Sequence, residues 1–376
     1  MDCPLTFESL KLSPEIMADI RRAGFIAPTA IQAQAIPPAL AGSDLIGCAQ
    51  TGTGKTAAFA IPIIERLAGG TGLRALVLAP TRELALQIRE CFDALGGGNH
   101  IRSTVLIGGE PMGPQLEALR RRPDVVVATP GRLLDHLDRR SLSLGSIRIL
   151  VLDEADRMLD MGFAPQIERI LKHVPLDRQT LCFSATMPLP MEQLVRRHMV
   201  RPVRVQSGPA ARPVEKVSQV VYPLNRDEKT PLLLSLLRGE REKVLVFTRT
   251  KHRAERLARA VGSAGHPVAR LHADRSQSER RQALEGFRAG HYLVLVATDI
   301  AARGIDVANI SHVINYDLPA TPEDYIHRIG RTARAEASGR ASSFAAPEES
   351  HQLQAIERHL GQPLRRERGR ARSKQG

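Results

Sequence analysis

The sequence predicts an α/β protein of two tandem domains, each a mostly parallel sheet flanked by helices. Three observations lead to this prediction. Short apolar runs alternate with segments of helical periodicity over residues 44–206, which is the pattern of parallel strands connected by helices. A second series of the same kind covers residues 217–345. The chain has 376 residues, which is long for one hydrophobic core and suits two domains.

The strands expected in both series are short and apolar, as buried parallel strands are. In the first series they are Asp44–Cys48, Arg74–Ala79, Ser103–Ile107, Asp124–Ala128, Ile147–Leu152, Thr180–Ser184 and Val203–Gln206. In the second they are Val217–Tyr222, Val244–Thr248, Pro267–Leu271, Tyr292–Ala297, His312–Asn315 and Ala341–Ala345.

The stretch between the two series is small and proline-rich, which predicts a linker over residues 207–213. The first domain therefore covers residues 1–206 and the second residues 214–363. Residues 364–376 are polar and rich in arginine. We expect them to form a disordered basic tail.

Composition favours a polyanionic partner. The net charge is +13, and 43% of the residues are hydrophobic, so the chain is globular and basic. Only 3% of the residues are aromatic and there is no Trp, which favours contact with a nucleic-acid backbone over base stacking. A basic surface without a partner is the alternative interpretation.

The four cysteines show no paired spacing, which argues against a zinc site and a disulfide framework. The first residues lack a basic region followed by an apolar stretch, and no apolar run approaches the length of a membrane span. We therefore expect a cytoplasmic protein.

A glycine-rich loop follows the first predicted strand. Residues 49–56 read Ala-Gln-Thr-Gly-Thr-Gly-Lys-Thr, and Gly52, Thr53 and Gly54 would let backbone N–H groups surround phosphate. Lys55 would reach the β- and γ-phosphates of a bound nucleotide, and the Thr56 hydroxyl would bind Mg²⁺. Ala49 occupies the first position of the loop, where the usual phosphate-binding pattern has Gly. The loop therefore indicates a phosphate site mainly because a strand precedes it and a helix follows it.

Four residues with three carboxylates end the fifth predicted strand. They are Asp153, Glu154, Ala155 and Asp156, and carboxyl ends of parallel strands are where open α/β sheets bind ligands. Asp153 would hold Mg²⁺, and Glu154 would polarise the water that attacks the γ-phosphate. A solvated acidic turn is the alternative for these residues taken alone.

With these motifs the chain resembles the DEAD-box ATP-dependent RNA helicases over about residues 7–345. The resemblance implies two RecA-like domains, which ATP and RNA close and hydrolysis reopens, with local unwinding of short duplexes or remodelling of RNA–protein complexes. Residues 157–163 are similar to the bacterial RhlE-like subgroup.

The resemblance also assigns roles that spacing alone does not. Residues 24–32 are similar to the family's Q motif, in which Gln32 reads adenine and Phe25 or Phe7 packs beside the base. Ser184 and Thr186 belong to a Ser-Ala-Thr motif that hydrogen-bonds Asp156 and couples ATP to unwinding.

Arg328, Arg331 and Arg334 recur at three-residue spacing, which predicts one side of a helix facing an anion. A solvated basic face is the alternative. The resemblance makes Arg331 and Arg334 the arginine fingers, and gives His327 and Arg328 an organising role at the domain interface. It also matches residues 296–306 to a motif in which Asp299 binds ribose and Asp306 tethers the arginine segment.

Polar loops after successive strands should contact RNA through its sugar–phosphate backbone, with 2′-hydroxyl contacts selecting RNA over DNA. The residues implied by the resemblance are Thr81, Arg82, Gly108, Gly109, Thr129 and Arg132 in the first domain, and Arg249, Gln277, Arg280, Thr298 and Arg303 in the second.

Three other functions fit the sequence less well. A DNA translocase is disfavoured by the Q motif and by Pro-Thr-Arg-Glu-Leu-Ala at 80–85, and a non-catalytic RNA-annealing protein by Glu154, Arg331 and Arg334. A P-loop kinase or small GTPase does not explain the second domain. The RNA client stays open among ribosome assembly, messenger decay and cold adaptation, as do protein partners from those pathways.

Overall fold

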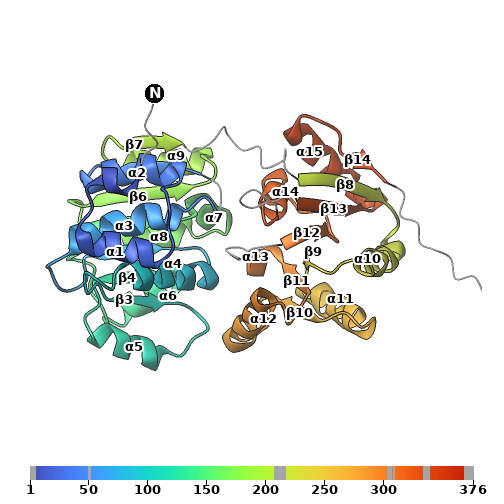
Figure 1. The fold of residues 1–376 in the computed structure, drawn as a ribbon, viewed down its shortest axis with the longest axis horizontal. Helices are drawn as coiled ribbons and strands as arrows, with labels where there is room; N and C mark the ends of the chain where they lie inside the picture. Colours follow the sequence, from blue (N-terminus) through green and yellow to red (C-terminus); the bar gives the residue numbers. More distant parts are fainter. Residues whose placement is uncertain are drawn as a thin grey trace, which may run out of the picture. The chain divides into compact units, whose positions relative to one another are not determined.

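The computed structural model describes residues 6–49, 52–206, 217–302, 307, 310–332 and 339–367. The chain divides into two compact units, Met1–Ala210 and Ala211–Gly376, so the division falls within the predicted linker. The linker itself lies outside the described residues. Figure 1 shows the first unit in blue to green and the second in yellow to red.

The first unit is built on a parallel sheet of seven strands in the order β3-β4-β2-β5-β6-β1-β7. Its strands are β1 (Leu45–Cys48), β2 (Ala75–Leu78), β3 (Ser103–Leu106), β4 (Val125–Ala128), β5 (Ile149–Leu152), β6 (Gln179–Ser184) and β7 (Val203–Gln206).

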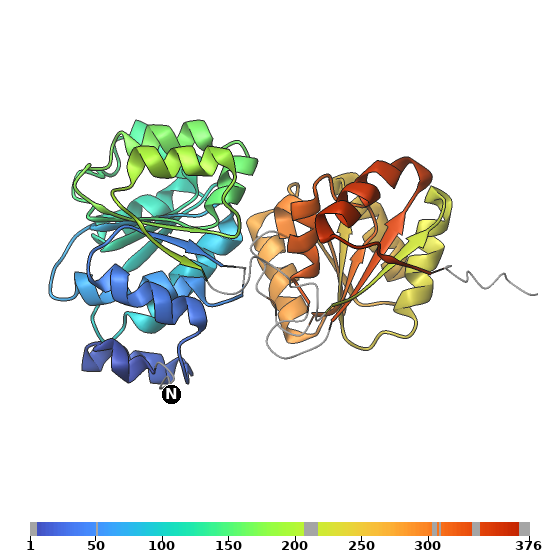
Figure 2. The same cartoon turned by 90° about the horizontal axis from the view of Figure 1, so that it is seen from above.

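Helices cover both faces of this sheet because successive strand residues point to opposite sides. In β5, Ile149 and Val151 join the core under one group of helices, and Leu150 and Leu152 join the core under the other. Figure 2 shows these two layers. The first layer contains η1 (Phe7–Leu10), α1 (Pro14–Arg22), α2 (Ala30–Leu40), α3 (Lys55–Leu67) and α4 (Arg82–Leu95). The second contains α6 (Pro130–Asp138), α7 (Ala155–Asp160), α8 (Ala164–Leu171) and α9 (Leu189–His198), while α5 (Met112–Arg120) packs beside β3.

The second unit repeats this architecture with strand order β10-β11-β9-β12-β13-β8-β14. Its strands are β8 (Val217–Pro223), β9 (Lys243–Thr248), β10 (Val268–Leu271), β11 (Val294–Thr298), β12 (Ile310–Asn315), β13 (Gly339–Ala345) and β14 (Arg365–Arg366). Its helices are η3 (Arg226–Glu228), α10 (Lys229–Leu237), α11 (Lys251–Ser263), α12 (Gln277–Ala289), α13 (Asp299–Ala302), α14 (Pro322–Ile329), η4 (Pro347–Glu349) and α15 (Ser350–Leu360).

All thirteen predicted strands are present, and the two-sheet α/β architecture is confirmed. The structure adds β14, which pairs with β8. Ordered backbone therefore continues to Glu367, whose N–H donates to the carbonyl of Val221. The prediction that a disordered tail starts at residue 364 is wrong for residues 364–367, because this arginine-rich segment contains a short edge strand. Residues 368–376 lie outside the described part of the chain.

In the part of the chain that the structure describes, no helix is both long and apolar enough to cross a membrane.

Candidate functional site

Strand order separates the two groups of predicted motifs within the first unit. Neighbouring strands β5, β6 and β1 carry the acidic residues, the Ser-Ala-Thr motif and the glycine-rich loop at their carboxyl ends. Strands β3, β4 and β2 form the other half of the sheet and carry the predicted RNA loops. Since all these strands are parallel, both groups lie along one edge of the sheet.

The glycine-rich loop opens onto helix α3, which starts at Lys55. Gly52 and Gly54 have φ values of +85° and +89°, a left-handed conformation that is cheap for glycine. The Lys55 side chain is buried and its Nζ donates to the carbonyl of Ala49 at 2.9 Å. The ammonium group is therefore folded back over the loop that would surround phosphate. Residues 50 and 51 lie outside the described part.

Gln32 connects this loop to the start of helix α2. Its Oε1 accepts from the backbone N–H of Thr29 at 2.9 Å, and its Nε2 donates to the carbonyl of Gly54 at 3.1 Å. The amide has one further donor hydrogen and one further acceptor lone pair. Gln32 can therefore hold the loop and still read an adenine edge. Phe25 lies edge-on to Phe7, with 6.3 Å between ring centroids.

The acidic residues after β5 are buried. Burial raises the pKa of Asp153 to about 6, while nearby Lys55 acts in the opposite direction. Glu154 has a left-handed backbone (φ 48°, ψ 49°) as the residue before helix α7, a conformation rare for residues other than glycine. This turn brings the Glu154 Oε2 to 3.0 Å from Nη1 of Arg157 in a buried ion pair. The sequence did not single out Arg157 as a site residue, because an Arg three residues after a Glu is common on helices.

Asp156 ties the acidic turn to the Ser-Ala-Thr motif, as expected. Its Oδ2 accepts from the backbone N–H groups of Ala185 and Thr186 at 3.1 and 2.9 Å, and from the Thr186 hydroxyl at 2.9 Å. The hydroxyl of Ser184 donates to the carbonyl of Thr186 at 2.6 Å. Ser184 therefore shapes the motif, while Thr186 makes the contact with Asp156.

Asp153 and Thr56 carry the kinds of donor atom that a magnesium ion takes as ligands. A carboxylate and the hydroxyl of Thr56 are hard oxygen ligands, and Mg²⁺ keeps several waters and takes substrate phosphates as further ligands. The described residues contain no group of three His, Cys, Asp or Glu side chains placed to hold a metal.

The predicted RNA loops of the first unit meet one another. Arg82 lies across the loop after β3, because a Cβ on Gly109 would fall 2.0 Å from its Nη1 and one on Gly108 3.6 Å from its Nη2. Thr81 caps helix α4 by accepting from the N–H of Leu84 at 3.3 Å. Thr129 precedes helix α6, from which Arg132 donates to the carbonyl of Glu110 at 2.9 Å.

The expectation that three arginines share one helix is wrong. Helix α14 ends at Ile329 and Gly330 caps it, so Arg331 follows the helix. Arg334 lies outside the described residues, as do Arg303 and Asp306. His327 lies in the last turn of α14.

Arg328 is anchored inside its own unit. Its Nε and Nη2 donate to the two carboxylate oxygens of Asp299 at 2.6 and 2.7 Å, and its Nη1 donates to Asn315 Oδ1 at 3.0 Å. The guanidinium also lies 4.9 Å from the ring centroid of Phe247. Asp299, assigned to ribose, is thus held in a bidentate pair, which fixes its orientation.

Arg249, a predicted RNA contact, takes part in a network of hydrogen bonds and ion pairs that the sequence did not predict. Its Nη2 donates to Glu349 Oε1 at 3.1 Å, and its backbone N–H donates to Asp317 Oδ2 at 2.8 Å. Glu349 also pairs with buried Lys229 at 2.7 Å. These partners come from segments 68 to 120 residues apart in the chain, so no local pattern could indicate them.

The other predicted RNA contacts of this unit lie at the ends of β11 and β10. Thr298 ends β11, and Gln277 and Arg280 lie in the first turn of α12. Both side chains on α12 are buried, and Arg280 Nη1 donates to the carbonyl of His272 at 3.3 Å.

Each of the two units matches a known protein family. The DEAD/DEAH box helicase family matches residues 29–194, and the helicase conserved C-terminal domain matches residues 228–336.

Curated relatives extend this match over most of the chain. A DEAD-box ATP-dependent RNA helicase CshA from Bacillus subtilis is 44% identical over 355 residues, which are 94% of this chain and 72% of that protein. The CshA protein of Geobacillus kaustophilus is 45% identical over 363 residues, covering 96% of this chain and 78% of the relative. These names point to a subgroup other than the RhlE-like one that residues 157–163 suggested, and that finer expectation is not confirmed.

Solved structures of DEAD-box helicases are similar to this chain over nearly its whole length. Dbp5 of S. cerevisiae bound to RNA and ADP-BeF₃ superposes with a TM-score of 0.88 at 32% identity, covering 97% of this chain and 96% of that one. Mss116p bound to single-stranded RNA and AMP-PNP gives a TM-score of 0.89 at 29% identity, covering 98% of this chain and 80% of the other.

Proposed function

This chain belongs to the DEAD-box ATP-dependent RNA helicases, and from its geometry we propose which of its residues hydrolyse ATP and which hold RNA. The observation that carries the proposal is the meeting of the glycine-rich loop, the acidic turn and the Ser-Ala-Thr motif on adjacent strands β1, β5 and β6. Asp156 joins two of these segments through three hydrogen bonds to one carboxylate oxygen. A change at the nucleotide can therefore reach the Ser-Ala-Thr motif directly.

In the proposed reaction the first unit binds ATP through backbone N–H groups of the glycine-rich loop and the Lys55 ammonium. Thr56 and Asp153 would hold Mg²⁺, which supplies charge neutralisation on the β- and γ-phosphates. Glu154 accepts a proton from the attacking water at a carboxylate oxygen. Arg157, 3.0 Å from that carboxylate, limits the rotamers of Glu154.

The RNA-contacting residues on the other half of the first sheet are proposed to bind phosphates and sugars. Thr81 and Thr129 occupy helix starts, where backbone N–H groups favour anions. The Arg82 side chain lies against the Gly108–Gly109 loop, so one guanidinium and two backbone amides lie close together. Such groups position the strand without reading its sequence.

The direct test is ATP turnover by the full chain with and without RNA. We expect single-stranded RNA to raise the rate strongly and DNA of the same sequence to raise it much less. ATP turnover that RNA does not stimulate would contradict the proposal. Preferential stimulation by DNA would favour the translocase, and RNA binding without phosphate release in a single turnover would favour a non-catalytic clamp.

Arg331→Ala is expected to lower kcat for ATP by about 10³-fold or more, as loss of an arginine finger does, while RNA affinity changes less than threefold. The reason is that the arginine neutralises charge that develops only in the transition state. Steady-state ATPase assays and RNA titrations in the presence of a non-hydrolysable ATP analogue measure the two effects. Weakened RNA affinity with preserved kcat would move Arg331 to the RNA surface.

Gly109→Ala is expected to weaken RNA binding about tenfold and leave ATP affinity unchanged. The new Cβ would fall 2.0 Å from Arg82 Nη1, so the flexible guanidinium must move off the loop. The left-handed φ of +77° adds strain of about 1 kcal/mol, which the fold tolerates. RNA affinity is measured by fluorescence anisotropy, with Gly113→Ala as the matched control because no atom lies within 4 Å of its added Cβ. Equal affinities for the two variants would refute the role of the Arg82–Gly109 contact.

A further inference from the structure

The connections that lead into the strands of the first sheet form a strongly basic surface, which we call the amino edge. They are residues 41–44, 68–74, 96–102, 121–124, 139–148, 172–178 and 199–202. Together they carry ten Lys or Arg and three Asp, an excess of seven positive charges, while the whole chain has a net charge of +13. More than half of the net charge therefore lies in a small part of the chain that has no role in the ATP and RNA contacts proposed so far.

The three acids of the amino edge leave much of this positive charge uncompensated. Asp44 is buried and accepts from two backbone N–H groups, each at 2.6 Å. Buried Asp124 lies 3.3 Å from Arg74, and exposed Asp177 lies 3.8 Å from Arg148. Among the described residues, no ion pair involves five exposed cations of this edge: Arg122, Arg139, Arg140, Lys172 and Arg201.

Three of these unpaired arginines have a left-handed backbone. The φ angles of Arg122, Arg140 and Arg201 are 51°, 55° and 44°, a conformation that glycine adopts readily and other residues rarely. Their turns follow helices α5, α6 and α9. The chain thus keeps arginine at three turns where glycine would be conformationally easier. Such unfavourable backbone conformations point to a use for the side chain.

The ends of helices do not explain this charge by themselves. Helices of the first unit end at the amino edge, and cations near a helix C-terminus are favourable. The second unit has the same architecture, yet its connections into β9, β10 and β11 (residues 238–242, 264–267 and 290–293) carry two Arg and two Glu. The excess of positive charge is therefore a property of the first unit and not a requirement of the fold.

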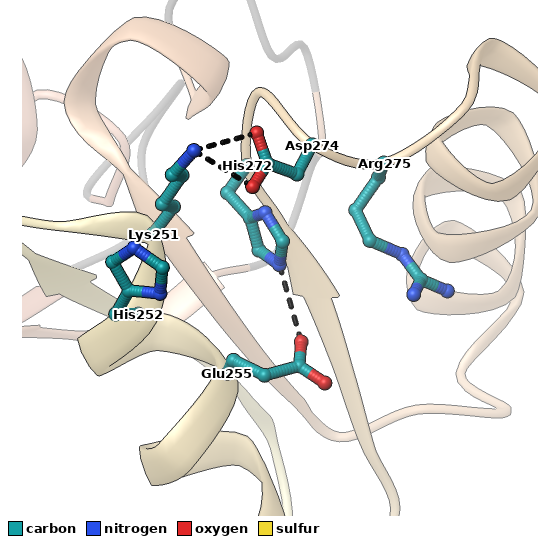
Figure 3. Close-up of a pocket in the computed structure, with 6 residues that line it drawn as sticks. All are labelled: Lys251, His252, Glu255, His272, Asp274 and Arg275. Atoms are coloured by element: carbon teal, nitrogen blue, oxygen red, sulfur yellow. Dashed lines mark hydrogen bonds and ion pairs between the residues drawn. The ribbon is translucent and has the colours of Figure 1, made fainter.

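The cations that line a polar cavity in the second unit have carboxylate partners. Figure 3 shows this cavity, in which Lys251 Nζ lies 2.8 Å from Asp274 Oδ2. Arg275, also in its wall, lies 2.6 Å from Glu279 Oε1 through Nη2. The five unpaired cations of the amino edge are freer to bind an anion than these two.

The exposed cations of the amino edge extend across the whole sheet. One or more of them leads into each of β3, β4, β5, β6 and β7: Arg102, Arg122, Arg140, Arg148, Lys172 and Arg201. Strands β3 and β7 are the two outermost of seven. Since neighbouring strands lie about 4.8 Å apart, the row of cations is about 30 Å long. A row of this length fits a chain of phosphates better than one small anion.

The residue types of the amino edge favour a nucleic-acid backbone over an acidic protein. Its connections contain no Phe, Tyr or Trp, and arginine and lysine bind phosphates without reading bases. Protein interfaces usually have an apolar core with large anchoring side chains. Leu176 and Val200 are exposed in the connections into β6 and β7, but those into β3, β4 and β5 expose no large apolar side chain.

We propose that the amino edge of the first sheet is a second RNA-binding surface, which holds the sugar–phosphate backbone of RNA that extends beyond the site at the carboxyl edge. Helix α3 runs from one edge to the other, and its 13 residues span about 20 Å. Only RNA that continues well past the carboxyl edge reaches this surface. The inference rests on the proposed RNA-binding function and adds to it a means of retaining long RNA.

The test replaces the three left-handed arginines by glycine in the full chain, as Arg122→Gly/Arg140→Gly/Arg201→Gly. Because glycine adopts this backbone readily, the variant should keep the wild-type Tm. Its affinity for a single-stranded RNA of about 40 nucleotides should fall about tenfold or more, and the slope of log affinity against log salt should become less steep by about two, since each lost phosphate contact removes about 0.7. Anisotropy titrations at several salt concentrations measure both effects.

An RNA decamer provides the internal reference, because its stimulation of ATP turnover needs only the carboxyl edge. Its kcat and half-saturating concentration should be the same for the glycine variant and the wild type. Lysine at the same three positions keeps the charge and should keep the wild-type salt slope. So should a control that removes three positive charges from exposed positions of the second unit: Arg238→Gln, Arg241→Gln and Arg358→Gln.

An unchanged salt slope and affinity for the long RNA in the glycine variant would overturn the proposal. So would a lysine variant that loses as much affinity as the glycine variant, because charge would then not be what binds. If the three arginines were needed to bind poly-glutamate and not RNA, the amino edge would be a surface for an acidic protein. A wild type whose ATP turnover the decamer does not stimulate would instead contradict the RNA-binding function itself.

Discussion

Glu154→Gln is expected to lower kcat for ATP by about 10²–10⁴-fold, the usual contribution of a general base. The amide keeps the shape of the side chain and can still accept a hydrogen bond from Arg157, which lies 3.0 Å from the carboxylate in the native enzyme. It cannot take a proton from the attacking water. ATP and RNA should therefore still bind, and the enzyme should accumulate in its substrate-bound form.

Two measurements distinguish a loss of the chemical step from a loss of ATP binding or folding. Phosphate release in a single turnover reports the chemical step, and titration with a fluorescent ATP analogue reports binding. Glu117→Gln is the matched control, since that acid is exposed on α5 and pairs with Arg121, the residue that follows the helix. If Glu154→Gln kept more than a tenth of the wild-type kcat, Glu154 would not be the base.

All strands of this protein except β14 could be predicted because each of them is encoded locally. Runs such as Ile149–Leu152 are apolar on both sides, and the burial of all four residues in the structure confirms a strand covered on both faces. The same reasoning placed Asp153 and Asp156 at a strand end. Because parallel strands share one carboxyl edge, the motifs could be expected to gather there before any contact was known.

The failures of prediction all involve tertiary partners. Arg328 and Arg331 have helical spacing, yet α14 ends at Ile329 and Arg328 turns inward to Asp299, 29 residues earlier in the chain. The Arg365–Arg366 strand has no apolar pattern and exists only because β8 offers a free edge. The left-handed turn at Glu154, which aims its side chain at Arg157, also has no sequence signature, because only the surrounding packing holds a non-glycine residue there.

Asp153→Asn should abolish Mg²⁺-dependent ATP turnover and at the same time stabilise the nucleotide-free protein. An amide is a poor replacement for a carboxylate ligand of Mg²⁺, so turnover should fall at least 10³-fold. Burial raises the pKa of Asp153 from 3.8 to about 6, which means that the ionised carboxylate destabilises the folded state. At about 1.4 kcal/mol for each unit of pKa, the penalty removed by the amide is about 3 kcal/mol.

The pH dependence of this gain follows from the direction of the shift. Well below pH 3.8 the carboxyl is protonated in the folded and unfolded chains alike, so the two proteins should be equally stable. As the pH rises from about 4 to 6, the unfolded chain loses its proton before the folded one, and the wild type progressively loses stability relative to the variant. Above pH 6 the difference is complete, and it should appear as a Tm about 5 °C higher for the variant.

Thermal melts without nucleotide or Mg²⁺ at pH 5.0 and 7.5 measure this gain. Asp177→Asn supplies the control, because that carboxylate is fully exposed at 102% and its replacement should leave Tm unchanged at both pH values. A variant no more stable than the wild type at pH 7.5 would mean that nearby Lys55 compensates the Asp153 charge in the empty site. A stabilised but inactive variant would instead show that this carboxylate is kept in place for its function at a cost to the stability of the fold.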